Sequence, residues 1–212
     1  MDKPCVGIVD YGAGNTGRWI NTLRNIGCVP VLIRSRSDFN TIDGLVIPGV
    51  GSYASASDKL FSTNLWKIVN ETISENKPVL GVCLGMQLLT ARGIEGGGAQ
   101  GLKYFSGNSI PISTDASMEL CPTLNIGWRK IDITDQGKKD PITRNWDSEN
   151  YFYFAHSYKI ELPSHQILAN TKFSSLTFPA LVGEGNVYGT QFHPEMSGLP
   201  GQIFLKTIFC EI

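Results

Sequence analysis

Residues 78–89 read Pro78-Val79-Leu80-Gly81-Val82-Cys83-Leu84-Gly85-Met86-Gln87-Leu88-Leu89. The run Pro78–Val82 is apolar without polar alternation, which is typical of a strand that is buried on both faces. A helix is expected to begin at Gly85 and to run toward Arg92. Cys83 therefore falls at a strand-to-helix junction, and this junction predicts an α/β fold.

The sequence before this junction alternates between strand-like and helix-like segments. Short apolar strands are expected at Val6–Val9, Val29–Ile33 and Gly44–Ile47. Apolar side chains at helical spacing predict a helix over Thr16–Ile26, with Gly27 as its C-cap, and another from Leu60 to about Asn76. Short apolar strands separated by helices predict a parallel sheet that is covered on both faces.

The sequence after the junction changes character. Turn residues separate further strand-like stretches at 110–112, 124–133, 151–160, 166–171, 180–182 and 186–191. The polar stretch 134–149 is expected to be a surface loop, and 201–209 a closing amphipathic helix. The prediction is one α/β domain over residues 1–212, with a mostly parallel central sheet flanked by helices and with antiparallel strands in its second half.

Length, charge and cysteine usage exclude several classes of protein. The chain has 212 residues, and its 18 Lys and Arg against 19 Asp and Glu leave a net charge of −1. Nucleic acid is not expected as a ligand, because phosphate binding requires clustered positive charge. No secretory signal is visible, and the longest apolar stretch falls short of the about 20 residues that span a bilayer, so no membrane association is expected. The five cysteines are scattered without a Cys-x-x-Cys pair, which argues against a disulfide framework or a zinc site and favours a cytoplasmic protein. No metal and no organic cofactor is expected.

Cys83 is a candidate nucleophile. Gly81 and Gly85, two positions to either side, permit a tight turn that exposes the side chain between them, as in the serine elbow of hydrolases. The helix dipole at this turn would favour the thiolate, and the Leu84 amide would point toward a tetrahedral oxyanion. A free cysteine is more often a small buried core residue, but the Gly-x-Cys-x-Gly context favours the nucleophile.

A nucleophilic thiol requires a base, and the strongest candidate is His193. It lies in Tyr188-Gly189-Thr190-Gln191-Phe192-His193-Pro194-Glu195, at the end of a strand-like run. Pro194 keeps its predecessor extended, so His193 and Glu195 can project to the same side. Glu195 could then accept from one imidazole nitrogen while the other faces Cys83.

The sequence gives less support for a functional role of the other two histidines, His156 and His165. His165 follows Pro163-Ser164 and is expected to be a solvated turn residue. His156, in Phe154-Ala155-His156-Ser157-Tyr158, is either a packing residue or part of a pocket wall, and the sequence leaves both readings open.

A third element is the loop Ile47-Pro48-Gly49-Val50-Gly51, just past a strand. Small residues let backbone N–H groups approach a ligand, so this loop could supply a second oxyanion donor, although most such stretches are simple turns. It is not a phosphate loop, because neither a Gly-Lys-Ser/Thr ending nor a Gly-x-Gly-x-x-Gly pattern occurs.

These stretches carry a family resemblance. Gly81–Leu89 and Gly189–Glu195 together resemble the class I (triad-type) glutamine amidotransferases. Shorter stretches are similar to the family of glutaminase subunits of imidazole glycerol phosphate synthase: Asp10-Tyr11-Gly12-Ala13-Gly14-Asn15, Pro48-Gly49-Val50-Gly51, Ile126-Gly127-Trp128 and His156-Ser157-Tyr158. They follow the family's order from residue 10 to residue 195, so the resemblance covers nearly the whole chain.

The resemblance implies hydrolysis of L-glutamine to glutamate and ammonia without a cofactor. Cys83 would form a thioester, His193 would pass protons, and Glu195 would orient the imidazole. The Leu84 amide and the loop residues Val50 and Gly51 would match the oxyanion hole. Positions that match the substrate-binding pocket are Gly49, Gln87, Glu95, His156, Ser157 and Tyr158.

The resemblance also implies a partner. In this family the ammonia passes to a (β/α)8-barrel synthase subunit, and the resulting heterodimer serves histidine biosynthesis. Asn15, Trp128 and Met196 match positions at the interface between the two subunits. The chain departs from the family's usual pattern, which has His where Asn125 stands, Asn for Arg129 and Lys for Met196. The segment Glu95–Ala99 also resembles an insertion.

These departures keep alternatives open. Similar paralogues supply ammonia for the amidation of a sugar in bacterial surface-polysaccharide biosynthesis, and the missing Lys makes that pathway the first alternative. A non-catalytic interaction subunit on the same fold would be expected to lose a triad residue, and all three are present. A stand-alone cysteine hydrolase acting on another amide is disfavoured by the matches in the glutamine pocket.

Overall fold

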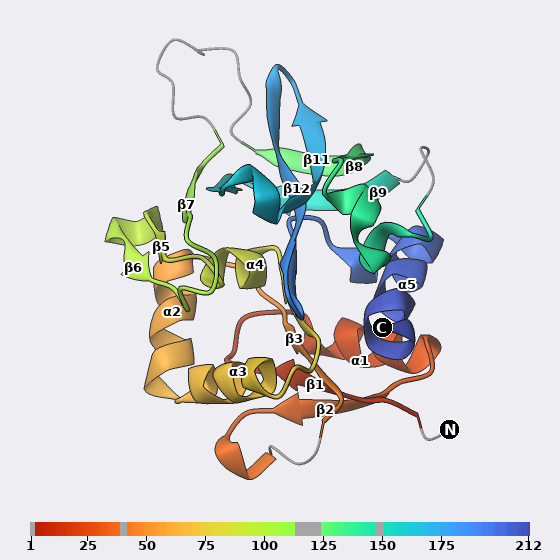
Figure 1. Ribbon diagram of the computed structural model, residues 1–212. Helices are drawn as coiled ribbons and strands as arrows, with labels where there is room; N and C mark the ends of the chain where they lie inside the picture. Colours follow the sequence, from red (N-terminus) through yellow and green to blue (C-terminus); the bar gives the residue numbers. More distant parts are fainter. Residues whose placement is uncertain (1–2, 39–41, 113–123, 147–150) are drawn as a thin grey trace.

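The first half of the chain forms alternating strands and helices, as predicted (Figure 1). The computed structural model describes residues 3–38, 42–112, 124–146 and 151–212. The strands of this half are β1 (Cys5–Val9), β2 (Val29–Ile33), β3 (Gly44–Ile47) and β4 (Val79–Val82). The helices are α1 (Thr16–Asn25), α2 (Tyr53–Ser62), α3 (Leu65–Ser74) and α4 (Leu84–Leu88). Gly27 follows α1 with φ 95°, and its N–H donates to the Arg24 carbonyl, so the predicted C-cap is confirmed.

The second half is mainly strands. They are β5 (Arg92–Gly93), β6 (Ala99–Gln100), β7 (Asn108–Pro111), β8 (Asn125–Ile133), β9 (Tyr151–His156), β10 (Tyr158–Glu161), β11 (Ile167–Phe173), β12 (Leu176–Glu184) and β13 (Val187–Thr190). Helix α5 (Gly198–Lys206) closes the chain and is followed by a π-helical turn, Thr207–Glu211. The closing helix therefore begins somewhat earlier than predicted, and its last turn is π-helical and extends past residue 209.

Two sheets result from these strands. The larger one has the order β2-β1-β3-β4-β13-β12-β11-β8-β9, and the smaller one the order β10-β7-β5-β6. In the larger sheet β2, β1, β3, β4 and β13 pair in parallel, and the remaining pairs are antiparallel. The predicted α/β class, parallel first and antiparallel later, is confirmed, and the larger sheet as a whole is mixed.

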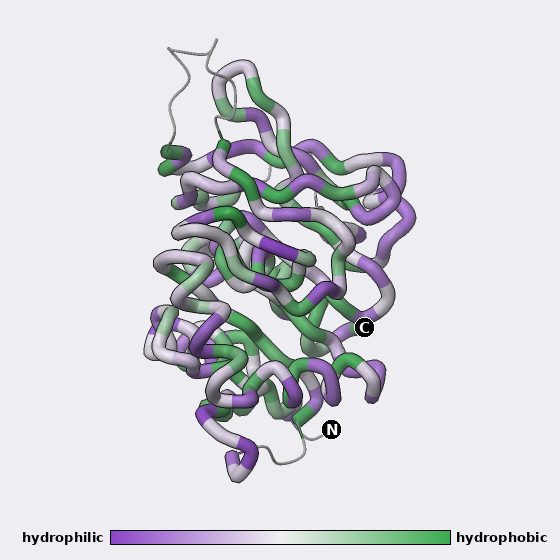
Figure 2. Tube along the Cα trace, turned by 90° about the vertical axis from the view of Figure 1, so that its left-hand side faces the viewer, coloured by the Kyte–Doolittle hydropathy of each residue, from purple (hydrophilic) through white to green (hydrophobic). Residues whose placement is uncertain are grey.

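Helices cover both faces of the parallel strands (Figure 1). On one face α1 and α5 pack against the sheet, with Trp19 fully enclosed. On the other face α2 and α3 contribute Leu60 and Ile68 to a second cluster. Ile8 belongs to the first cluster and Val9 to the second, as successive strand residues must when both faces are buried. In Figure 2 hydrophilic stretches are frequent along the edges of the molecule, in agreement with this burial of the strands.

The last strand returns to the centre of the larger sheet. β13 lies between β4 and β12 and is parallel to β4, while β3 pairs with the other side of β4. The carboxyl ends of parallel neighbours meet at one edge of a sheet. The segments that follow β3, β4 and β13 therefore lie together, and they carry the Pro48–Gly51 loop, Cys83 and His193.

The helix predicted from Leu60 to about Asn76 is wrong in one respect, because two helices occupy this range. Asn64, between α2 and α3, adopts the left-handed conformation with φ 58°. The Thr63 hydroxyl donates to the Lys59 carbonyl at 2.6 Å and so closes α2. The continuous apolar spacing hides this break, because both helices bury their apolar side chains on the same face of the sheet.

The helix predicted to run from Gly85 toward Arg92 is also too long. α4 ends at Leu88, and Arg92 begins β5. The Thr90 hydroxyl donates to the Gln87 carbonyl at 2.7 Å, which satisfies a group that the helix end leaves free. The chain then turns into the smaller sheet.

The strand predicted over 151–160 is two strands in different sheets. β9 pairs with β8 in the larger sheet, whereas β10 pairs with β7 in the smaller one. Ser157 lies at the bend between them, and the Ile112 N–H donates to its carbonyl at 2.9 Å. An apolar pattern does not reveal which partner each half of a strand has, so the sequence did not predict this break.

The stretch 134–149 is only partly a surface loop. It contains short 3-10 turns at Gly137–Lys139 and Pro141–Thr143, and Ile142 is buried. The Trp146 ring lies 5.1 Å from that of Phe152, centroid to centroid, at the edge of the core. Residues 147–150 lie outside the described part of the chain.

The cysteines of the described ranges are free thiols. The Sγ atoms of Cys28 and Cys210 lie 3.6 Å apart, and burial together with the neighbouring Cys210 raises the pKa of the Cys28 thiol to about 12. Cys121 lies outside the described residues. No helix in the described ranges is long and apolar enough to cross a membrane.

Candidate active site

The chain turns sharply between β4 and α4, and Cys83 is the residue at the turn. Its backbone angles, φ 54° and ψ −107°, lie outside the regions that L side chains ordinarily adopt. Such strain persists only where the surrounding structure holds it, and it clusters at active sites. The Cys83 N–H donates to the Thr190 carbonyl at 2.7 Å, so β13 holds the turn. This is the geometry of a nucleophile elbow.

The glycines on either side of Cys83 permit this turn. A Cβ atom on Gly85 would lie 1.8 Å from the Ile47 carbonyl oxygen, and one on Gly81 would lie 2.7 Å from the Gly85 carbonyl oxygen. The backbones of β3, β4 and α4 therefore approach more closely than any side chain allows.

Replacing Gly85 with alanine should lower the free energy of unfolding by about 3 kcal/mol or more, because the backbone of β3 or α4 has to shift to admit the methyl group. Chemical denaturation measures this loss. Gly17→Ala in α1 is the matched control, since a Cβ there would lie 3.8 Å from Asn15 Oδ1, an ordinary contact distance. That variant should be neutral or more stable by about 1 kcal/mol. Equal stability of the two variants would show that the elbow is not closely packed.

His193 and Glu195 lie on the segment that follows β13. The Nδ1 atom of His193 is 2.8 Å from Oε1 of Glu195. The His193 N–H donates to the Tyr153 carbonyl of β9 at 2.8 Å, and the Ser197 hydroxyl donates to the His193 carbonyl at 2.6 Å. The antiparallel half of the sheet thus fixes the backbone of the histidine.

The environment of His193 favours its charged form. Burial lowers the pKa of His193, but the hydrogen-bonded contacts with Cys83 and Glu195 outweigh burial and raise the pKa to about 10. Only 5% of His193 is exposed. The imidazole therefore keeps its proton through the neutral range, and an imidazolium beside a thiol is the partner that a thiolate requires.

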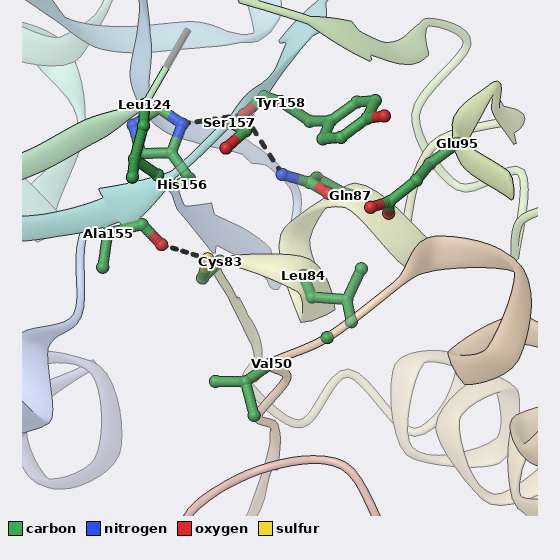
Figure 3. Close-up of a pocket in the computed structure, with 11 residues that line it drawn as sticks. Val50, Cys83, Leu84, Gln87, Glu95, Leu124, Ala155, His156, Ser157 and Tyr158 are labelled. Atoms are coloured by element: carbon green, nitrogen blue, oxygen red, sulfur yellow. Dashed lines mark hydrogen bonds between the residues drawn. The ribbon is translucent and has the colours of Figure 1, made fainter.

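A cavity of about 260 Å³ opens at the sulfur of Cys83 (Figure 3). It lies between the two sheets, because Cys83 follows a strand of the larger sheet whereas Tyr158 begins a strand of the smaller one. Most of the residues predicted for the oxyanion hole and the substrate pocket line it: Val50, Gly51, Leu84, Gln87, Glu95, His156, Ser157 and Tyr158.

Gly49 does not line this cavity. A Cβ atom on Gly49 would lie 2.7 Å from the Tyr11 hydroxyl oxygen and 2.9 Å from the Gly85 nitrogen. The Tyr11 hydroxyl donates to the Pro48 carbonyl at 2.6 Å. Gly49 therefore lets the loop after β3 pack directly on the elbow. It lines a neighbouring cavity rather than the one at Cys83.

Glu95 is held at the far end of the cavity by the start of a helix. Its Oε2 atom accepts from the Tyr53 N–H, the first of α2, at 2.6 Å. Ser52, which precedes that helix, makes no side-chain cap, so Glu95 caps it from outside. Burial and the Glu95 carboxylate also raise the pKa of Tyr158. The site thus presents a fixed negative charge opposite the thiol.

His156 both packs against the protein and lines the cavity, the two roles that the sequence leaves open. It lines the cavity, yet both of its ring nitrogens face groups of the protein, Asn125 Nδ2 at 2.9 Å and the Tyr158 carbonyl at 2.7 Å. Burial lowers its pKa to about 4. His156 is therefore neutral at neutral pH and shapes the wall of the cavity.

Sequence reasoning missed three residues at this site. Leu124 and Ala155 line the cavity, and the Cys83 thiol lies 3.8 Å from the Ala155 carbonyl oxygen (Figure 3). The Gln191 Nε2 atom donates to the Cys83 sulfur at 3.6 Å. Gln191 and Ala155 lie close in sequence to His193 and His156, in the same motifs, and this proximity was the available signal.

The residues predicted for a partner interface lie outside the cavity at Cys83. Asn15 and Met196 line a neighbouring cavity of about 300 Å³, together with His193 and Glu195. Trp128 projects from β8 and is 50% exposed, and Met196 is 38% exposed. Asn15 and Met196 therefore share one cavity, and Trp128 and Met196 are accessible to a partner.

The sequence of the chain that carries this elbow and its histidine–carboxylate pair matches a known family. The family model for glutamine amidotransferase class-I matches residues 7–211, and the chain belongs to that family. It is thus a glutamine-hydrolysing amidotransferase.

The more specific similarity is to one kind of subunit. The imidazole glycerol phosphate synthase subunit HisH of Lactococcus lactis is 34% identical over 205 residues, which cover 97% of this chain and 98% of that protein. The protein of the same name from a Geobacillus species is 35% identical over 204 residues, with 95% and 94% coverage.

Solved structures agree on the fold. Residues covering 98% of this chain superpose on 98% of a chain in the structure of PurLQS from Thermotoga maritima, with a TM-score of 0.73 and 16% identity. The crystal structure of a glutamine amidotransferase from Thermotoga maritima gives a TM-score of 0.61 at 16% identity, covering 97% of this chain and 82% of that one.

Proposed function

We propose that Cys83, His193 and Glu195 act as a catalytic triad that hydrolyses L-glutamine to glutamate and ammonia. The observation that carries this proposal is the convergence of β3, β4 and β13. It sets a strained cysteine in the wall of the cavity, where it interacts with a histidine that is hydrogen-bonded to a carboxylate. This is the nucleophile, base and orienting group that acyl transfer requires.

The chemistry follows from the positions of these groups. The Cys83 thiolate attacks the side-chain amide carbon of glutamine, and the negative charge develops on the amide oxygen. The Leu84 N–H at the start of α4 and the Val50–Gly51 loop line the cavity with Cys83, and they would donate to that oxygen. The His193 imidazolium gives its proton to the departing ammonia and leaves a thioester. His193, now neutral, takes a proton from water, which attacks the thioester and releases glutamate.

The cavity suits the free amino acid. Glu95 supplies a carboxylate that would bind the α-ammonium group of glutamine, and Gln87 stands between it and the sulfur (Figure 3). The Gln87 side chain donates to the Tyr158 carbonyl at 3.3 Å, so it is already oriented.

We further propose that the ammonia passes to a (β/α)8-barrel synthase partner, as in imidazole glycerol phosphate synthase. The full-length similarity to HisH subunits supports this assignment. Met196 is exposed beside Glu195, so the partner would meet an apolar side chain there. Amidation of a sugar in surface-polysaccharide biosynthesis is the second candidate, favoured only by that apolar position.

The reaction of Cys83 with 6-diazo-5-oxo-L-norleucine, an electrophilic analogue of glutamine, tests the glutamine site. The expected result is one adduct on Cys83 by peptide mass spectrometry, formed at a rate that saturates with the analogue and is suppressed by L-glutamine. Iodoacetamide, which does not resemble glutamine, should label without saturation. Labelling of another cysteine, or no protection by glutamine, would show that the cavity does not bind glutamine.

A further inference from the structure

A continuous chain of hydrogen bonds runs from β8 to the wall of the glutamine cavity. Asn125 and Arg129 are four residues apart on β8, so their side chains lie on the same face of the strand. The Arg129 Nε–H donates to Asn125 Oδ1 at 3.1 Å. The Asn125 amide group meets the His156 ring at 2.9 Å, and that ring meets the Tyr158 carbonyl at 2.7 Å.

The groups at the two ends of this chain of hydrogen bonds determine the position of each proton in it. An arginine can only donate, so the Asn125 side chain turns its oxygen toward Arg129 and its NH₂ group toward His156. A carbonyl can only accept, so the proton of the His156 ring stands on Nδ1, facing Tyr158. The Nε2 atom then accepts from Asn125, and the ring is neutral. One arrangement satisfies all the partners.

Arg129 is well suited to hold this arrangement. Its two terminal nitrogens donate to the backbone carbonyls of Trp128 and Ile126, at 3.0 and 3.3 Å, and its guanidinium lies 5.3 Å from the centre of the Phe173 ring. Asn125 is fully buried and His156 is 5% exposed, so neither has water as a substitute partner.

This chain of hydrogen bonds ends at groups that the proposed reaction uses. The Tyr158 carbonyl also accepts from Gln87 at 3.3 Å, and Gln87 donates to Gln191 at 3.4 Å. Gln191 in turn donates to the Cys83 sulfur at 3.6 Å. His156 thus contacts the Tyr158 carbonyl on one side of its ring and Asn125 on the other.

We propose that Arg129 and Asn125 are positioning residues, which fix the tautomer of His156 and through it the wall of the glutamine cavity. This inference rests on the proposed glutaminase function. Without Arg129 the Asn125 amide can rotate, and without Asn125 the imidazole can turn or exchange its proton between nitrogens. In either case the Tyr158 carbonyl loses the His156 donor and keeps only the longer hydrogen bond from Gln87.

Labelling of Cys83 by 6-diazo-5-oxo-L-norleucine separates binding from reactivity. We expect Asn125→Ala to raise the half-saturating concentration of the analogue about tenfold, the effect of one lost hydrogen bond, with the maximal rate changed less than about twofold. Arg129→Ala should raise this half-saturating concentration less than Asn125→Ala does, and Arg129→Lys should raise it less than Arg129→Ala. The double alanine variant should match Asn125→Ala alone, because the two residues act through the same chain of hydrogen bonds. Labelling by iodoacetamide, which does not use the wall, should be unchanged in all of them.

Arg24→Ala, at an exposed arginine of α1, is the matched control and should behave as the unmodified chain. Unchanged half-saturation in the Asn125 and Arg129 variants, or additive effects of the two, would overturn the proposal. If the unmodified chain itself shows no saturation and no protection by glutamine, the proposed function fails instead, and the two failures are distinguishable.

Nitrogen-15 NMR of the histidines gives a readout that needs no activity, and its central expectation concerns the unmodified chain. We expect His156 of the unmodified chain, assigned with a His156→Gln variant, to be neutral with its proton on Nδ1 at pH 7. Arg129→Ala should show a mixture of tautomers or exchange broadening. A proton on Nε2 in the unmodified chain would contradict the inference directly.

Discussion

Replacing Cys83 with alanine should reduce glutamate release from glutamine by at least about 10⁴-fold, to the background of the assay. The reason is that the proposed reaction passes through a bond to the Cys83 sulfur, and no other thiol reaches the cavity within the described residues. Coupled enzymatic detection of glutamate, with and without a barrel partner, measures the loss.

The fold should survive this change. Cys83 is 6% exposed at a turn held by backbone hydrogen bonds and flanking glycines, and alanine removes only one sulfur atom. Circular dichroism and thermal unfolding should match the unmodified chain, and the variant should still bind L-glutamine in calorimetry. Residual turnover above about 1% in a properly folded variant would mean that Cys83 is not the nucleophile.

His193→Ala should be nearly as severe as the loss of the thiol, since His193 serves both proton transfers, whereas Glu195→Gln should cost only about 10²-fold to 10³-fold. Glutamine at position 195 keeps the shape and a hydrogen bond to the imidazole, but it removes the negative charge that holds the proton. Steady-state glutaminase rates of the two variants test this order. Small and equal losses would show that the triad is wrongly assigned.

The pH profile separates the role of Glu195 from simple damage. In the unmodified chain the contacts with Cys83 and Glu195 hold the pKa of His193 near 10, above its ordinary value, so the imidazolium persists as pH rises and is lost only near pH 10. The alkaline limb of kcat/KM should lie there. In Glu195→Gln the imidazolium loses its counter-charge, and the limb should move to lower pH. An unmoved limb would show that the carboxylate does not set this titration.

The elbow could be predicted from the sequence because its causes are local. Two glycines flank one cysteine between an apolar strand and a helix, and the structure shows that a side chain at Gly85 would overlap the backbone of β3. The alternation of strands and helices before Cys83 predicted the parallel half of the sheet for the same reason. Each of these segments carries its own pattern, even though the order of the strands in the sheet differs from their order in the chain, since β1 lies between β2 and β3.

Features that depend on distant partners could not be predicted in the same way. Nothing in the pattern over 151–160 shows that Ser157 is where the chain leaves one sheet for another. The break at Asn64 arises from a left-handed residue that apolar spacing does not detect. The hydrogen bond between Arg129 and Asn125, which turns two departures from the family pattern into a matched pair, becomes visible only in three dimensions.

The most direct test of the proposed glutaminase is glutamate release by the purified chain, alone and mixed with the (β/α)8-barrel synthase of histidine biosynthesis and that enzyme's own substrate. We expect slow release by the isolated chain and stimulation of at least about tenfold by the loaded partner, a change of about 1.4 kcal/mol in the barrier. Absence of stimulation, with Cys83 still labelled in a glutamine-protected reaction, would point to another ammonia acceptor. No glutamate under either condition, together with no protection of Cys83 by glutamine, would contradict the assignment of Cys83, His193 and Glu195 as a glutaminase triad.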